Sequence, residues 1–369
     1  MIKSCYVHIP FCKTICSYCD FCKNYHNKKI VKKYLLALEN EIKENYKNNT
    51  LNTLYIGGGT PSSLLPDELE TLFKILGKFK LEKDYEFTFE CNYEDITKKL
   101  LVFLKNNRVN RLSIGIESFN NKFQSILNRK INKDQMLKKI KLAKEYFNNI
   151  NVDLMYDLPT QTIDDLKEDI KIFKGLNVNH ISTYSLIVED HTDLKIKGNI
   201  KLDEELSLKM YNTIIKELKE SGYIHYEISN FAKEGYQSKH NLTYWNNDEY
   251  YGFGAGASGF VNKIRYDNTR SIINYINDNK RLNEEKINKK QMMLDEVMLN
   301  LRKINGINKK EFKAKYKVNL CDVFDYHELL LQGLIKEEND FVFIQNKYLY
   351  VSNEVILKFL DKYKLLNKS

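Results

Sequence analysis

A sixfold alternation of short β-type runs with longer helical patterns over residues 1–222 constrains the fold most strongly. The β-type runs cover residues 5–9, 53–56, 86–89, 111–116, 152–155 and 180–186. Between them, apolar residues recur at helical spacing, as in 30–46, and Pro66 stands at the first position of one such segment. Strands that alternate with helices imply right-handed crossovers and a parallel sheet. Six units are too few to close an eightfold barrel, so an α/β fold with a partial, open (β/α)6 barrel is predicted, its site at the carboxyl ends of the strands.

The pattern changes after residue 222. Residues 223–260 are rich in aromatic residues and glycine, and the run Gly252, Gly254, Gly256 and Gly259 favours irregular backbone over a helix. From about residue 289, helical patterns are followed by alternating residues over 341–351 and a last helix. We therefore expect three parts: a barrel core over 1–222, an aromatic, glycine-rich extension over 223–288, and a small helical domain with a β-hairpin, similar to a winged helix, over 289–369.

Composition and charge narrow the functional classes. Lys and Arg number 58 against 49 Asp and Glu, which gives a net charge of +9. The lysines are spread along every amphipathic segment rather than clustered, so a solvated surface is expected and a nucleic-acid partner is not. No apolar run approaches the ~20 residues of a membrane-spanning helix, and the N-terminus has no signal-peptide pattern. A cytoplasmic protein is predicted.

Four of the seven cysteines fall within eleven residues, at Cys12, Cys16, Cys19 and Cys22. A cytosolic chain does not keep disulfides, so this cluster indicates metal or redox chemistry. The first three form CxxxCxxC directly after the first predicted strand. Three thiolates on one loop can hold three irons of a [4Fe-4S] cluster and leave the fourth iron open to a small molecule. Zinc is the alternative, but it prefers paired CxxC units, and a four-thiolate site with Cys22 would need a very tight turn. We expect Cys22 to be a free thiol near the cluster.

Seven short sequence motifs occur along the predicted barrel: YVHIPFC, CDF, YIGGGTPS, SIGIESFN, NRK, VDLMYDLPTQT and HISTYSLI. In this order and spacing they resemble radical SAM proteins of the oxygen-independent coproporphyrinogen III oxidase-like family. The later string HNLTYW resembles one branch of that family, the HemW heme chaperones. The resemblance implies that the open iron binds S-adenosylmethionine (SAM), and that one electron cleaves a carbon–sulfur bond to give a 5'-deoxyadenosyl radical.

The resemblance also implies roles for residues near the strand ends. Charged residues there are expected to belong to a site, because burying them without a partner is costly. The glycine-rich loop after the second strand lets the backbone approach a ligand and expose N–H groups. Glu117 stands where the family usually has glutamine, and it could pair with Arg129 or with the sulfonium of SAM. The implied contacts are Gly58, Gly59 and Thr60 for the methionine end, Tyr6 and Tyr18 for the adenosyl part, and Glu90, Arg129 and Asp153 for the sulfonium, carboxylate or ribose groups.

The HNLTYW element has two interpretations. Imidazole is a standard axial ligand of heme iron, and Trp245, the single tryptophan, could pack on a porphyrin face. His240 is therefore a candidate heme contact. Alternatively, the element is a loop whose histidine and tryptophan brace the barrel mouth. The other six histidines show no metal-binding spacing, and Cys5, Cys91 and Cys321 are expected to be buried small residues.

Two functions follow from the resemblance. A heme chaperone would bind heme and hand it to respiratory membrane proteins, and it could form a homodimer. A true coproporphyrinogen III oxidase would perform oxidative decarboxylation. The family's oxidases carry an N-terminal extension that closes the site, whereas eleven residues precede Cys12 here. Together with HNLTYW, this short N-terminus favours the chaperone.

Overall fold

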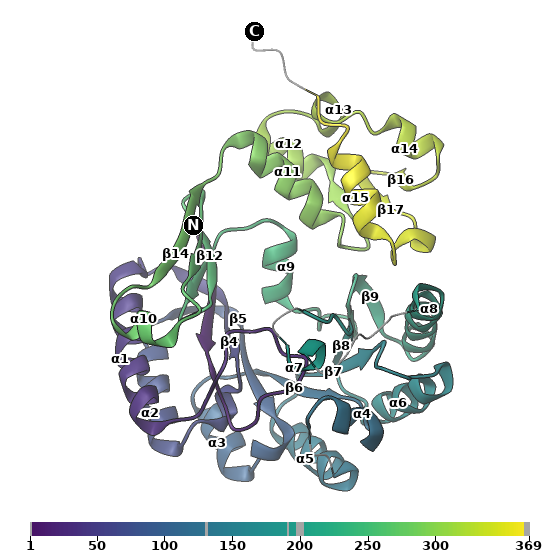
Figure 1. Cartoon of the computed structure of the whole chain (residues 1–369). Coiled ribbons are helices and arrows are strands. Elements are labelled where there is room, and N and C mark those ends of the chain that lie inside the picture. Colours follow the sequence, from purple (N-terminus) through teal and green to yellow (C-terminus); the bar gives the residue numbers. More distant parts are fainter. Residues whose placement is uncertain (1, 130–131, 190–191, 197–202, 365–369) are drawn as a thin grey trace.

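The computed structural model describes residues 2–129, 132–189, 192–196 and 203–364. One mixed sheet of twelve strands dominates it, in the order β14-β13-β12-β11-β1-β4-β5-β6-β7-β8-β10-β9. Its six central strands are parallel and curve into an open half-barrel (Figure 1). They are β1 (Ser4–Ile9), β4 (Thr50–Gly58), β5 (Lys80–Asn92), β6 (Arg111–Glu117), β7 (Ile150–Tyr156) and β8 (His180–Ser185). The predicted partial barrel is confirmed.

Helices cover the outer face of the half-barrel. Their starts follow local capping chemistry: the Asn27 side chain accepts hydrogen bonds from two backbone N–H groups of α1, and Pro66 opens α2. The helices between the strands are α1 (Lys28–Asn45), α2 (Pro66–Leu76), α3 (Lys98–Asn106), α4 (Asn121–Ile126), α5 (Lys133–Tyr146), α6 (Ile163–Leu176), α7 (Asp193–Ile196) and α8 (Glu204–Glu220). Two short 3-10 turns, Pro61–Ser63 and Tyr93–Asp95, follow β4 and β5.

The two faces of the barrel strands differ in polarity. In β6, Leu112, Ile114 and Ile116 are fully buried under the helices. The alternate positions of the same strand carry Arg111, Ser113, Gly115 and Glu117, and these line a cavity. Successive residues of a strand point to opposite faces, so an apolar outer face and a polar inner face follow from the same short sequence. The barrel interior is therefore a polar cavity rather than a packed core.

The segment 223–288 extends the sheet at both edges. A hairpin of β9 (Ile224–Glu227) and β10 (Asn230–Ala232) pairs with β8, and β11 (Tyr250–Phe253) pairs with β1. Beyond β11 come β12 (Ser258–Val261), β13 (Ile264–Asn268) and β14 (Arg281–Lys286), with α10 (Ile272–Ile276) between the last two. HNLTYW lies on a helix, α9 (Lys239–Trp245), which Ser238 caps, so the expected loop is wrong for this element. Strands from both sides of residue 222 share one sheet.

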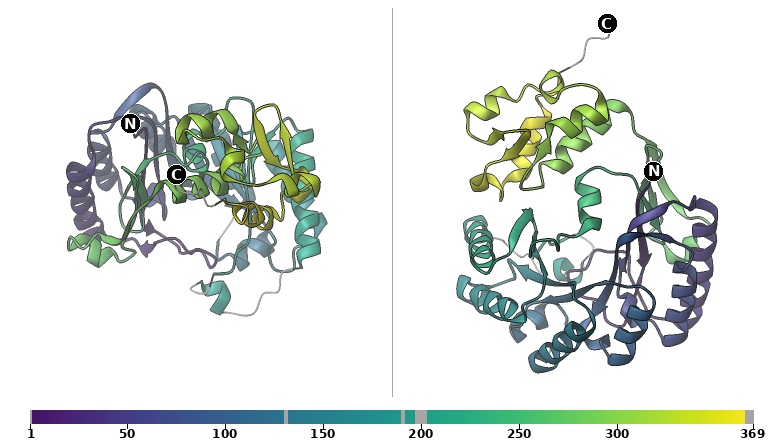
Figure 2. Two further views of the ribbon diagram at one scale, coloured as in Figure 1. Left: turned by 90° about the horizontal axis from the view of Figure 1, so that it is seen from above. Right: turned by 180° about the vertical axis from the view of Figure 1, so that it is seen from behind.

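Residues from 289 onward form a small domain that docks on the edge strand β9 and on α9 (Figure 2). The Ile228 N–H donates to the carbonyl of Arg302 at 3.0 Å, and the Ile304 N–H to that of Tyr226 at 3.1 Å. The domain contains α11 (Lys289–Asn300), α12 (Lys309–Tyr316), α13 (Leu320–Val323), α14 (His327–Leu331), α15 (Ser352–Leu360), β15 (Ile307–Asn308), β16 (Ile335–Glu338) and β17 (Phe341–Ile344). The expected strand over 341–351 ends already at Ile344, and a 3-10 turn follows over Asn346–Tyr348. No helix among the described residues has the length and apolar character needed to cross a membrane.

Candidate functional site

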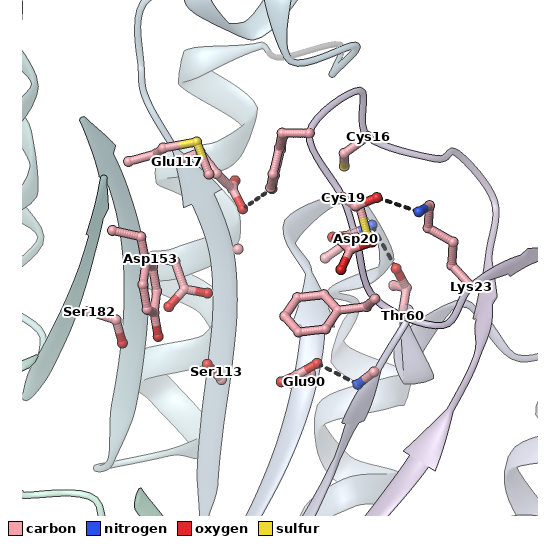
Figure 3. Close-up of a pocket in the computed structure, with 18 of the residues that line it drawn as sticks. Cys16, Cys19, Asp20, Lys23, Thr60, Glu90, Ser113, Glu117, Asp153 and Ser182 are labelled. Carbon is pink, nitrogen blue, oxygen red and sulfur yellow. Dashed lines mark hydrogen bonds between the residues drawn. The ribbon is translucent and has the colours of Figure 1, made fainter. Parts of the chain in front are cut away.

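A cavity of about 450 Å³ opens at the carboxyl ends of the barrel strands. The cysteine loop forms one wall, and the ends of β4 to β8 form the others (Figure 3). Eleven of the thirteen residues predicted for the site line this cavity; Tyr6 and His240 do not. The eleven are Cys12, Cys16, Tyr18, Cys19, Gly58, Gly59, Thr60, Glu90, Glu117, Arg129 and Asp153.

The cysteine loop runs between two short parallel strands, β2 (Phe11–Cys12) and β3 (Asn24–Tyr25). The Thr60 hydroxyl donates to the Cys12 thiol at 3.5 Å, and the Lys23 ammonium donates to the carbonyl of Cys19. Burial raises the pKa of Cys12 to about 11, and it also raises the pKa values of Cys16 and Cys19. Without a metal these thiols keep their protons at neutral pH, so metal binding must release protons here.

The donor set fits a three-cysteine cluster better than a zinc ion. Among the residues that the structure describes, no three potential ligands converge on one metal-ion position. A structural zinc site requires such convergence, whereas in an iron–sulfur cluster each thiolate binds its own iron. Cys22 lies outside the cavity lining, and its thiol donates to the carbonyl of Arg270 at 3.2 Å. Cys12, Cys16 and Cys19 stay the predicted ligand set.

The glycine-rich loop passes directly beside the first cysteine. Gly58 has a φ of +118°, and a Cβ there would lie 2.7 Å from the His8 ring. A Cβ at Gly59 would lie 2.9 Å from the Cys12 sulfur. Close approach therefore requires glycine at both positions. The expected exposure of N–H groups is wrong, because those of Gly58, Gly59 and Thr60 all donate within the protein, to Glu90, Ile9 and Phe11.

Glu117 pairs with Arg129 across the cavity. A guanidinium nitrogen lies 2.5 Å from a Glu117 carboxylate oxygen, and the two side chains are only 9–10% exposed. The Tyr18 hydroxyl donates to the other Glu117 oxygen at 2.9 Å, and Arg129 also donates to the carbonyl of Gly115 at 3.1 Å. Glu117 was expected to pair with Arg129 or with the sulfonium of SAM, and in the structure it pairs with Arg129. A neutral counterpart such as glutamine would leave the Arg129 charge free for a ligand.

Glu90 and Asp153 face each other from β5 and β7. Glu90 accepts hydrogen bonds from the Tyr55 hydroxyl at 2.8 Å and the Gly58 N–H at 3.1 Å. Burial raises the pKa of Glu90. Burial, together with the negative charge of Glu117, raises the pKa of Asp153 to about 7. A cationic ligand between these carboxyl groups would favour their charged forms.

Asp153→Asn should change how stability depends on pH. The pKa of Asp153 is about 7 in the folded state and 3.8 for the free side chain, so the unfolded chain loses this proton first as pH rises. The wild-type, metal-free protein should therefore lose stability relative to Asp153→Asn between about pH 4 and pH 7, with no further change above pH 7. Anaerobic urea unfolding at several pH values measures this difference. Asp134→Asn, at an exposed carboxylate, is the control, and an equal pH dependence in Asp153→Asn and wild type would contradict the prediction.

Tyr6 lies outside the main cavity. Its hydroxyl is 2.9 Å from Nδ1 of His8, and both residues line a second cavity of about 400 Å³ together with Cys22 and Arg270. Asp20 and Phe21 of the cysteine loop line both cavities. The predicted adenosyl contact of Tyr6 therefore requires a ligand that reaches past this loop.

His240 lies at the opposite end of the barrel from the cysteines. It is 2% exposed, with Nδ1 at 2.8 Å from the Thr53 hydroxyl and Nε2 at 2.8 Å from the Tyr244 hydroxyl. Burial lowers its pKa to about 3. Trp245, at the end of the same helix, lies under the Arg302 guanidinium at 5.8 Å. The helix braces the barrel floor rather than its mouth, and His240 offers neither ring nitrogen to a heme iron in this structure.

Several cavity residues escaped the motif-based prediction. What these residues share is their position in the strands: every second residue before a predicted charged residue at a strand end points to the same face as that residue. Counting back from Glu117 in this way leads to Ser113 and Arg111, and from Asp153 to Asn151. Tyr55, Asn92, Ser182 and Tyr184 occupy equivalent inward positions, and Asn241 enters from α9.

Comparisons with known proteins agree with this arrangement. Residues 6–173 match the Radical SAM superfamily. The heme chaperone HemW of Lactococcus lactis is 38% identical, with 97% of each chain covered, and that of Bacillus subtilis is 37% identical, covering 98% of this chain and all of the relative. The chain belongs to the HemW family. This HemW-family chain also shares the fold of the coproporphyrinogen III oxidase HemN of Escherichia coli, with a TM-score of 0.85 at 21% identity, over 97% of this chain and 90% of that one. Because the HemW family belongs to the radical SAM superfamily, this membership implies that the chain binds a [4Fe-4S] cluster and SAM.

Proposed function

We propose that the protein is a heme chaperone that binds heme and transfers it to respiratory enzymes, using a [4Fe-4S] cluster and SAM. The near full-length similarity to the HemW heme chaperones carries this proposal. It includes the extension and the C-terminal domain as well as the barrel, so the relatives share the whole architecture. Respiratory membrane proteins as recipients, a cytoplasmic location and a homodimer stay predictions.

In this proposal the cysteine loop holds the cluster through Cys12, Cys16 and Cys19. When bound, the cluster supplies an electron and an open iron for SAM. The glycine-rich loop 58–60 lies beside the methionine end, and Tyr18 lies beside the adenosyl part. Glu90, Asp153 and Arg129 contact the sulfonium, carboxylate or ribose groups, and Arg129 is also paired with Glu117. The cavity thus presents both charge signs to a zwitterionic cation.

The proposal includes heme binding through His240, on the condition that this side chain first becomes accessible. The hydrogen bonds to Thr53 and Tyr244 must open before either ring nitrogen can bind iron. A movement of α9 away from β4 would break the bond to Thr53, whereas the bond to Tyr244 lies within the helix and opens only when one of the two side chains rotates. Such a movement would also involve the C-terminal domain, which packs on α9.

Hemin titration of the anaerobically reconstituted protein tests the proposal. We expect a saturable shift of the hemin absorption band for wild type and a weaker one for His240→Ala. The exposed His327 gives a matched control, His327→Ala, which should bind as wild type does. Unchanged affinity in His240→Ala would remove the ligand role, and absence of any hemin binding would overturn the chaperone function.

The runner-up function, oxidative decarboxylation of coproporphyrinogen III, is tested in the same preparation. Similarity to HemN at 21% identity shows a shared fold and leaves the reaction to be measured. An anaerobic assay with SAM and a reductant should give no protoporphyrinogen. Sustained product formation would move the protein to the oxidase function.

A further inference from the structure

The floor of the cavity carries an arginine that the proposed SAM site does not use. Arg111 begins β6, and its side chain lines the same cavity as the cysteines although the residue is only 2% exposed. It lies two inward positions below Gly115, which contacts Arg129. The guanidinium is therefore near the end of the barrel that α9 covers, whereas the cysteine loop lies at the other end.

Arg111 has almost no partner in the protein. Its guanidinium makes one hydrogen bond among the described residues, to the Thr88 hydroxyl at 3.5 Å, and its Nε is buried without a partner. The salt bridges of the described chain do not include it. A buried guanidinium that lacks a counter-charge is costly, so a native protein normally provides an anion for it.

The acidic side chains near Arg111 are already engaged with other donors. Glu86, on the neighbouring strand, accepts from the backbone N–H groups of Lys239 and His240, both at 3.0 Å, and so holds the start of α9. Glu90 accepts from Tyr55 and Gly58. Arg111 interacts electrostatically with Glu90, but no hydrogen bond or ion pair among the described residues joins the two. The guanidinium N–H groups of Arg111 are therefore available to a ligand in the cavity.

Two further donors line the cavity with Arg111. The Ser113 hydroxyl accepts from the Asn151 amide at 2.8 Å, and its own hydrogen has no acceptor among the described residues. Asn241 also lines the cavity, and among the described residues its only hydrogen bond to a side chain is made by its backbone N–H, which leaves the side-chain amide available. A guanidinium, a hydroxyl and an amide are the groups that bind a carboxylate through charge-assisted hydrogen bonds.

We propose that Arg111, Ser113 and Asn241 form a carboxylate-binding subsite at the cavity floor, and that it takes a propionate arm of a tetrapyrrole. The choice of ligand rests on the proposed heme chaperone function, whereas the subsite itself rests on the unpaired arginine. The carboxylate of SAM offers the same chemistry. Its expected position is near the cysteine loop, at the other end of the barrel, so the two sources can be separated by experiment.

Hemin and hemin dimethyl ester, which lacks the two carboxylates, form the matched ligand pair. Wild type should bind the diacid roughly ten- to a hundredfold more tightly than the ester, as expected for a charged hydrogen bond to a buried cation. Arg111→Gln should lose most of this preference and Arg111→Lys should keep part of it. The surface variant Arg108→Gln, three residues earlier, should behave as wild type. SAM affinity should be unchanged in all three.

The results that would contradict the proposal can be told apart, because each overturns a different part of it. Equal binding of acid and ester by wild type overturns the subsite and leaves the chaperone function standing, and this arm holds even if Arg111→Gln does not fold. A fall in SAM affinity in Arg111→Lys assigns the arginine to SAM and overturns the tetrapyrrole ligand. If hemin does not bind at all, the proposed function fails, and glutarate then tests the subsite alone. Glutarate should raise the melting temperature of wild type more than that of Arg111→Lys, and equal shifts overturn the subsite.

Discussion

Cys16→Ser is expected to abolish the iron–sulfur absorption of the anaerobically reconstituted protein, whereas Cys22→Ser should leave it intact. Cys16 lines the cavity with Cys12 and Cys19, so its removal leaves two thiolates for the cluster. The Cys22 thiol instead donates to the carbonyl of Arg270, outside that lining. Visible spectra with iron and sulfide analysis measure both variants.

The same pair of variants separates the cluster from the zinc alternative. A four-thiolate zinc site would need Cys22 as its fourth ligand. Loss of metal in Cys22→Ser together with retention in Cys16→Ser would contradict the three-cysteine assignment. Cys321, in the C-terminal domain, is exposed, so the expectation that it is buried is wrong. Cys321→Ser therefore controls for general effects of removing a thiol.

Arg129→Met should destabilise the protein by about 3–5 kcal/mol, because it leaves the buried Glu117 carboxylate without its counter-charge. Only the Tyr18 hydroxyl would remain as a side-chain donor to Glu117. The same substitution should abolish SAM binding, since the cavity wall between β6 and the cysteine loop depends on this pair. Urea unfolding of the metal-free protein and equilibrium dialysis with SAM measure the two effects.

A second substitution makes this prediction specific to the pair. Arg129→Met combined with Glu117→Gln removes both charges and should recover most of the lost stability, because no buried charge remains unpaired. Glu117→Gln alone keeps Arg129 bonded to Gly115 and Asn92, so its cost should be smaller. Simple additivity of the two single substitutions would show that the pair contributes no coupling, contrary to the 2.5 Å contact.

The fold was predictable because its signals are local and repeated. Five of the six β-type runs lie within a barrel strand, and the sixth, 180–186, extends one residue beyond β8. The alternation with helices leaves little freedom for the topology. The helix α9 escaped prediction because its seven residues contain several aromatic and polar side chains and lack a clear apolar period. Its position depends on Glu86, more than 150 residues earlier, which accepts from its first N–H groups.

The candidate site was predictable where residues follow strand ends, since parallel strands bring those ends together. Hydrogen-bond partners were harder to predict. The N–H groups of the glycine-rich loop were expected to face a ligand, but Glu90 and the β1–β2 segment use them. His240 could be recognised as unusual from its motif, whereas its burial depends on contacts with Thr53 of β4, which no local pattern encodes.

The place of β1 in the sheet has a consequence for synthesis on the ribosome. This strand leads into the cysteine loop, and its two neighbours are β4, some 50 residues later, and β11, some 245 residues later. Until residues 250–253 emerge, one backbone edge of β1 has no partner, and an unpaired edge can recruit strands from other chains. For most of its translation, a nascent chain therefore carries its cysteines next to a strand that is unpaired along one edge. If iron and sulfide were inserted during this time, the cluster would form on a sheet that is not yet complete. Once residues 250–253 have emerged, β11 can pair with that edge of β1 and end this period.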